Sequence, residues 1–158
     1  MIERHLLDSL SVVAYIQGHN IADVGTGPGL PGMVLAIVYP EKQFTLMDSN
    51  GKKTRFLQQA KQELGLENIA IYNGRVESYP QQQSFDTVIS RAFASLNDML
   101  TWTRTLGAAE ARFLAMKGAY PVQELANLPV GFQLLESYPL QVPLCDAERH
   151  LLVFALSC

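Results

Sequence analysis

Gly25-Thr26-Gly27-Pro28-Gly29-Leu30-Pro31-Gly32 is the stretch that decides the fold of this chain. It follows a short apolar run, residues 20–24, and precedes a second one, residues 33–38. That order predicts a strand, a glycine-rich turn and a helix. Glycines in such a turn allow backbone N–H groups to approach a ligand without an intervening Cβ, and the start of the helix favours negative charge.

One acidic residue complements the glycine-rich turn. Asp48 ends the next apolar run, residues 43–47, nineteen positions after Gly29. A carboxylate at the tip of a second strand can accept hydrogen bonds from both hydroxyl groups of a ribose. Together the turn and the carboxylate predict a pocket for a cofactor that contains adenosine.

The rest of the chain shows alternating strand and helix patterns. An amphipathic opening helix is predicted from Ile2, Leu6, Leu10 and Val13, closed by Gly18. A helix capped by Ser49 or Asn50 and ended by Gly65 is expected to bury Phe56, Leu57, Ala60 and Leu64. A later helix carries Leu96, Met99, Leu100 and Thr103 on one face. Strands are expected over residues 21–24, 44–47, 69–72, 86–90, 113–116, 132–135 and 151–156.

Strands that alternate with helices indicate an α/β fold with a mostly parallel sheet. Only the loop from Pro139 to Arg149 separates the last two strands. Because no crossover helix fits in that loop, we expect an antiparallel strand pair at one edge of the sheet.

Composition narrows the class of protein. The 158 residues predict one domain, 1–158, with 48% hydrophobic and 17% charged residues. Cys145 and Cys158 form neither a disulfide framework nor a metal-ligand spacing, and no metal is expected. With no apolar run near the ~20 residues of a membrane span, we expect a reduced, cytoplasmic protein without a membrane partner. A net charge of −3 argues against sequence-blind binding to nucleic acid but leaves room for a local basic face.

Two overlapping glycine patterns point to different cofactors. Residues 27–32 match G-x-G-x-x-G, the dinucleotide pattern. Asp23 followed by G-x-G-x-G over residues 25–29 resembles the first motif of the class I methyltransferases, in which the acidic residue and the first glycine face the methionine end of S-adenosylmethionine. The antiparallel pair at the end of the α/β order favours the methyltransferase, and the chain is too short for the second half of a typical nicotinamide dehydrogenase. A polar and aromatic cluster ends the fourth strand, where such methyltransferases hold their acceptor.

The chain resembles one family over nearly its whole length, in order. The matching segments are residues 3–10, 23–32, 46–53, 74–77, 90–96, 116–118 and 148–151. They resemble the bacterial 16S ribosomal RNA guanine-N7 methyltransferases, also called glucose-inhibited division protein B. Asn50 stands where a leucine is common. Family members also carry a helical segment before the opening helix, so we expect this chain to lack an N-terminal helical segment.

The resemblance implies a function and a set of site residues. The implied reaction transfers a methyl group from S-adenosylmethionine to N7 of a guanine in the decoding region of 16S ribosomal RNA. The implied partner is that RNA or the small ribosomal subunit, and a monomer is expected. Implied cofactor contacts are Gly25, Gly27, Gly29, Leu30, Asp48, Val76, Glu77 and Arg91.

The acceptor side of the site is expected to hold Arg91 and Phe93 as positioning residues. Arg91 can donate hydrogen bonds to guanine O6, to the methionine carboxylate or to a phosphate, or can form a salt bridge on the rim of the sheet. Phe93 can stack on a base or belong to the core. Guanine N7 presents a lone pair without losing a proton, so no general base is expected, and His5 and His150 qualify as bases by residue type alone.

RNA binding is weakly marked in the sequence. The residues expected to bind RNA are Arg75, Lys52, Lys53, Lys117 and Arg149. A solvated helix face is the alternative interpretation of the two adjacent lysines. A small-molecule methyltransferase, a non-catalytic S-adenosylmethionine-binding module and a nicotinamide-binding fragment remain alternative functions.

Overall fold

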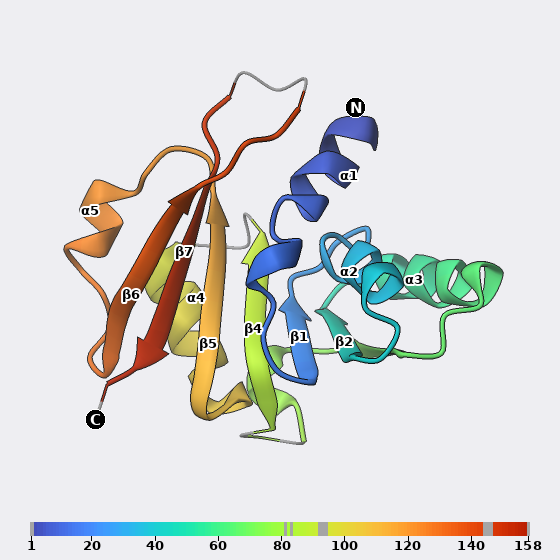
Figure 1. Cartoon of the computed structure of the whole chain (residues 1–158). Helices are drawn as coiled ribbons and strands as arrows, with labels where there is room; N and C mark the ends of the chain where they lie inside the picture. The colour runs from blue at the N-terminus through green and yellow to red at the C-terminus, as the bar shows by residue number, and fades with distance from the viewer. Residues whose placement is uncertain (1, 81, 83, 92–94, 144–146, 158) are drawn as a thin grey trace.

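A computed structural model describes residues 2–80, 82, 84–91, 95–143 and 147–157. Its centre is a seven-stranded sheet in the order β3-β2-β1-β4-β5-β7-β6 (Figure 1). The strands are β1 (Asn20–Val24), β2 (Gln43–Asp48), β3 (Ile69–Asn73), β4 (Phe85–Arg91), β5 (Gly107–Lys117), β6 (Phe132–Pro139) and β7 (His150–Leu156). The first five strands are parallel, and β7 pairs antiparallel with both β5 and β6. The predicted antiparallel pair is therefore confirmed.

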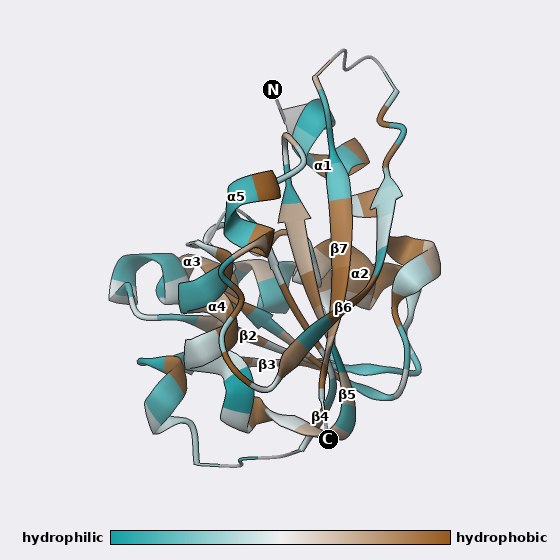
Figure 2. Cartoon of the chain, turned by 90° about the vertical axis from the view of Figure 1, so that its left-hand side faces the viewer, coloured by the Kyte–Doolittle hydropathy of each residue, from teal (hydrophilic) through white to brown (hydrophobic). Residues whose placement is uncertain are grey.

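Helices cover both faces of the sheet. One core contains side chains of α2 (Gly32–Val38) and α3 (Gly51–Leu64), and α1 (Ile2–Leu10) contacts α2. The other core contains side chains of α4 (Leu96–Thr103), which lies behind β5 and β7 in Figure 1. The remaining helices are α5 (Val122–Leu125) and the short 3-10 turns η1 (Val13–Tyr15), η2 (Val76–Ser78) and η3 (Arg104–Leu106). In Figure 2 the strands at the centre of the sheet are largely hydrophobic, whereas α3 is largely hydrophilic.

Local signals in the sequence account for the boundaries of α3. The Asn50 side chain accepts hydrogen bonds from the backbone N–H groups of Lys52 and Lys53, as the capping prediction required. Gly65 ends the helix with a φ of 65°, a left-handed conformation that favours glycine. The predicted buried face of α4 is also confirmed, since its four predicted residues are all buried.

The predicted buried face of α3 is partly wrong. Phe56 and Leu64 on α3 are 54% and 55% exposed, because only the side of the helix that carries Thr54 and Leu57 faces the sheet. The helix thus covers the sheet with a narrower apolar stripe than its sequence indicates.

The predicted buried face of the opening helix is wrong at Leu6 and Leu10, whereas Val13, which lies in η1, packs partly buried against the core. Leu6 and Leu10 are 40% and 44% exposed, whereas Asp8 and Ser9 are buried. The helix also ends at Leu10, well before Gly18. Its polar side is buried because it faces charged groups at the carboxyl edge of the sheet, as described below.

Close packing of α2 against the sheet depends on Gly32. A Cβ at this position would lie 2.2 Å from Cδ2 of the fully buried Leu46 and 2.7 Å from Oδ2 of Asp23. Gly32→Ala is therefore expected to lower the free energy of unfolding by about 1–3 kcal/mol through overpacking. Urea denaturation measures this loss. The control is Gly51→Ala in the first turn of α3, where the nearest atom is 3.6 Å away and alanine should maintain or raise stability. Equal stability of the Gly32 variant and the wild type would contradict the prediction.

Candidate functional site at the carboxyl edge of the sheet

Asp23 anchors the glycine-rich turn from beneath. This residue lies near the end of β1 and is fully buried. Its Oδ2 accepts hydrogen bonds from Thr26 Oγ1 at 2.8 Å and from the Gly32 N–H at 2.7 Å. One carboxylate oxygen thus binds the beginning of the turn and the beginning of α2. The expectation from family resemblance that this acidic residue faces the cofactor differs from its observed place under the loop.

The environment of Asp23 also changes its acidity. Burial raises the pKa of its carboxyl group from 3.8 to about 7, although the hydrogen bonds from Thr26 and Gly32 oppose the shift. Its second oxygen, Oδ1, is buried and has no hydrogen-bond partner among the described residues. A carboxylate with one unsolvated oxygen is costly to ionise, which agrees with the direction of the shift.

Backbone hydrogen bonds fasten the turn to the end of β2. The N–H groups of Gly25 and Thr26 both donate to the carbonyl oxygen of Met47, at 2.9 and 3.1 Å. Gly25 has a φ of 67° and Gly27 a φ of 57°. Residues with a Cβ rarely adopt these backbone conformations. The turn therefore curves over the ends of β1 and β2 and leaves the space above them open.

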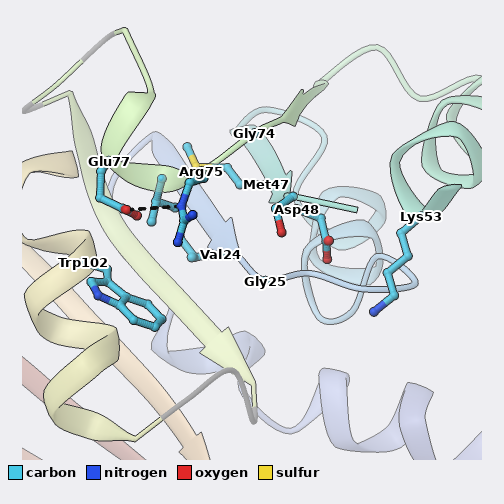
Figure 3. A pocket seen from close by; sticks show the side chains of 11 residues that line it. Val24, Gly25, Met47, Asp48, Lys53, Gly74, Arg75, Glu77 and Trp102 are labelled. Atoms are coloured by element: carbon cyan, nitrogen blue, oxygen red, sulfur yellow. Dashed lines mark ion pairs between the residues drawn. The ribbon is translucent and has the colours of Figure 1, made fainter. Parts of the chain in front are cut away.

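A cavity of about 450 Å³ lies at this edge, over the ends of β1, β2 and β3 (Figure 3). Its volume is within the range of small-molecule sites in proteins. Figure 3 shows Trp102 on one side of the cavity and Asp48 and Lys53 on the other. The lining residues are Val24, Gly25, Met47, Asp48, Ser49, Lys53, Gly74, Arg75, Val76, Glu77 and Trp102.

The carboxylate of Asp48 is held in place by backbone groups. Its Oδ2 accepts a hydrogen bond from the Gly27 N–H at 3.0 Å, and its Oδ1 accepts one from the Asn50 N–H at 2.9 Å. Each carboxylate oxygen can accept a further hydrogen bond, so an oriented acceptor pair faces the cavity.

The structure brings together part of the predicted cofactor set. Four of the predicted cofactor contacts line the cavity: Gly25, Asp48, Val76 and Glu77. The other four lie outside the lining: Gly27, Gly29, Leu30 and Arg91. Gly27 acts through its hydrogen bond to Asp48, and the backbone of Gly29 passes close to the side chain of Leu57.

Trp102 is the lining residue that the sequence patterns did not single out. It lies on α4, 38% exposed, beside the buried stripe of that helix. Contact between α4 and η2 brings its ring to the cavity, on the side of the residues that follow β3. No local signal marks this position, because the contact joins segments about 25 residues apart. Met47, Ser49 and Gly74 were also missed, although they directly flank predicted site residues.

Arg91 lies outside the cavity, in a cluster of charged groups beneath α1. Its Nη1 lies 3.1 Å from Nδ1 of His5 and 3.9 Å from Oδ2 of Asp8. Arg149 Nε donates a hydrogen bond to Asp8 Oδ1 at 3.2 Å. The salt bridge considered for Arg91 is thus present. Phe93 lies outside the described residues.

The predicted RNA-binding residues have different surroundings. Lys53 and Arg75 line the cavity, and Arg75 Nε lies 3.6 Å from Glu77 Oε2 in an exposed ion pair. Lys52 is exposed on the first turn of α3. Lys117 Nζ lies 3.3 Å from Oε1 of Glu124, so its charge is already paired.

The fold and the cavity define a class of protein. The structure is similar to the CcbJ methyltransferase from Streptomyces caelestis, with a TM-score of 0.77 and 11% identity over 98% of this chain and 96% of that one. It is also similar to a SAM-dependent methyltransferase from Aquifex aeolicus, with a TM-score of 0.74 and 15% identity over 96% and 92% of the two chains. The fold is that of the class I S-adenosylmethionine-dependent methyltransferases, as the sequence predicted.

Sequence relatives identify the family within this class. Residues 1–152 match the model of the GidB family, described as rRNA small subunit methyltransferase G. Proteins named ribosomal RNA small subunit methyltransferase G are 61% identical in Marinomonas sp. (strain MWYL1) and 54% identical in Ectopseudomonas mendocina (strain ymp). The matches cover 97% and 99% of this chain and 74% of each relative. The chain belongs to the GidB family, and the family predicted from the sequence is confirmed.

Two further findings concern the described residues. None of their helices combines the length and apolar character needed to cross a membrane. No group of three or more His, Cys, Asp and Glu side chains among them is arranged to hold a metal ion.

The raised pKa of Asp23 predicts a particular pH dependence of stability. Because its folded-state pKa of about 7 exceeds the ordinary 3.8, the folded protein binds more protons than the unfolded chain between these values. The contribution of Asp23 to the free energy of unfolding therefore falls as pH rises from about 4 to about 7 and is constant above. Asp23→Asn should remove this slope, whereas Asp98→Asn on the exposed first turn of α4 should retain it. Parallel stability curves for wild type and Asp23→Asn would show that Asp23 ionises normally.

Proposed function

We propose that this protein transfers a methyl group from S-adenosylmethionine to N7 of a guanine in the 16S ribosomal RNA of the small subunit. Membership of the GidB family supports the RNA substrate. The single observation that carries the cofactor is the cavity between the Asp48 carboxylate and the Trp102 ring. The proposed site of action is the cytoplasm, and the proposed acting form is the monomer.

The cavity residues fit the parts of S-adenosylmethionine. The oriented Asp48 carboxylate would accept hydrogen bonds from the two ribose hydroxyls. Val76 and Trp102 supply apolar and aromatic surface for the adenine ring. The curved turn at Gly25 leaves room for the backbone to approach the methionine part, which would extend towards the end of β4.

Little proton chemistry is required of the protein. S-adenosylmethionine supplies an electrophilic methyl group when bound, and guanine N7 offers a lone pair without prior deprotonation. The contribution of the chain is to align the methyl group with guanine N7 and to exclude other orientations of the two reactants. This is consistent with the surroundings of the two candidate bases. His5 contacts Arg91, and His150 Nδ1 lies 2.8 Å from the carbonyl oxygen of Gly118.

The RNA is proposed to approach the same edge of the sheet. Arg91, at the end of β4, is proposed to position the acceptor guanine together with Phe93. Lys53 and Arg75 line the cavity, and Lys52 is exposed next to Lys53 on α3. All three are proposed to contact phosphates. Lys117 and Arg149 remain proposed RNA contacts at the ends of β5 and β7, where each also pairs with a carboxylate.

The cofactor proposal predicts the effect of a change at Asp48. Asp48→Asn should weaken binding of S-adenosylmethionine and S-adenosylhomocysteine by about 1–3 kcal/mol, because hydrogen bonds to a charged acceptor are lost. Trp102 is the only tryptophan in the chain, so its fluorescence should change on binding and report the affinity. Calorimetry provides an independent measurement, and Asp98→Asn is the matched control. Unchanged affinity of the Asp48 variant would exclude its ribose contact.

The activity is tested by the methylated product. The protein is incubated with labelled S-adenosylmethionine and either intact small subunits or protein-free 16S ribosomal RNA from cells that lack this methyltransferase. Label should appear in 7-methylguanosine after nuclease digestion of at least one of these RNAs. Label at another atom would contradict the N7 assignment. Binding of the cofactor without transfer to either RNA would instead favour the non-catalytic or small-molecule alternatives.

A further inference from the structure

The cluster beneath α1 has a composition that packing alone does not explain. A short helix at the surface ordinarily buries its apolar side. Here α1 buries Asp8, which is 6% exposed, and leaves Leu6 and Leu10 40% and 44% exposed. Burying an ion pair contributes little net stability, because desolvation offsets the attraction between the charges. The burial of Asp8 therefore points to a role other than stability.

The two arginines come from distant parts of the chain. Arg91 ends β4, and Arg149 directly precedes β7, with β5 between these strands. Asp8 spans this distance, since its Oδ1 lies 3.2 Å from Arg149 Nε and its Oδ2 lies 3.9 Å from Arg91 Nη1. One carboxylate thus holds two guanidinium groups above the end of β5.

The cluster remains cationic and retains unused donors. One carboxylate and two guanidinium groups leave one net positive charge. Arg91 Nη1 lies 3.1 Å from Nδ1 of His5. Arg149 Nη1 donates to the carbonyl oxygen of Glu148. Among the described residues, no hydrogen bond joins Nη2 of either arginine to a protein acceptor.

We propose that Asp8 is a positioning residue for the RNA: it holds Arg91 and Arg149 side by side so that together they bind one phosphate next to the target guanine. This rests on the proposed function, because it places the phosphate beside the acceptor. Two guanidinium groups that flank one carboxylate suit a phosphodiester, which accepts several hydrogen bonds at once. Without the carboxylate, the two like charges repel and the long side chains are free to move apart.

The test uses Asp8→Asn in the full chain, with Glu110→Gln as control. Glu110 is exposed on the opposite end of β5, so its change removes the same charge away from the cluster. The single-turnover rate of the Asp8 variant at saturating RNA should fall roughly ten- to a hundredfold, as expected for a misplaced contact. The affinity for S-adenosylhomocysteine should stay within about twofold, since the cavity is a separate site.

Salt dependence separates positioning from a structural role. Removal of Asp8 uncovers positive charge, so the slope of log affinity for RNA against log salt should steepen by up to about one. The rate would thus fall while electrostatic attraction to RNA rises. A purely structural residue would instead lower melting temperature, cofactor affinity and rate together, and that result would overturn the proposal.

A double-mutant cycle provides the second measurement. Arg149→Gln alters a more accessible member of the cluster, with 25% of its side chain exposed. It should lower the rate and make the slope shallower, and Asp8→Asn should add little to the rate loss in this background. Additive losses, or full activity of Arg149→Gln, would overturn the proposal. Failure of the wild type to methylate RNA would instead refute the proposed function, so the two failures are distinguishable.

Discussion

The hydrogen bonds to one buried carboxylate oxygen hold the carboxyl edge of this sheet together. Asp23 Oδ2 binds Thr26 at the start of the glycine-rich turn and Gly32 at the start of α2. The contact requires a residue without a Cβ at position 32, because any larger side chain would occupy the place of the carboxylate. The path of the turn, the direction of α2 and the open space above β1 all follow from this arrangement.

Side chains alternate between the two faces of each strand, so functional groups gather at two places along that edge. Val24 and Met47 point to the face covered by α4 and become apolar walls of the cavity, together with Trp102. Asp48 follows Met47 directly and is oriented by the Gly27 N–H, so its carboxylate meets the same cavity from its rim. Farther along the edge, Arg91 ends β4 and meets α1 instead. The polar contact at the cavity and the charged contact under α1 therefore lie at the ends of β2 and β4, which β1 separates.

Net charge is a poor guide to where this protein meets RNA. The whole chain is negative, with 15 acidic and 12 basic residues besides three histidines. Three of its predicted RNA-binding cations nevertheless lie in ion pairs at or near the carboxyl edge. Lys117 and Arg149, whose side chains are 19% and 25% exposed, are held in defined places by their carboxylate partners. This local order is compatible with an acidic protein that acts on a nucleic acid.

The amino-acid sequence by itself determined the features that depend on neighbouring residues. The glycine-rich turn, Asp48 at the end of the second strand and the Asn50 cap of α3 were all predicted, because their signals lie within a few positions of each other. Tertiary structure alone decided the places of Trp102 and Asp8. Trp102 reaches the cavity through packing of α4 against the segment after β3. Asp8 is buried because it meets Arg149, 141 residues away, and periodicity within a helix cannot reveal a charged partner so distant in the chain.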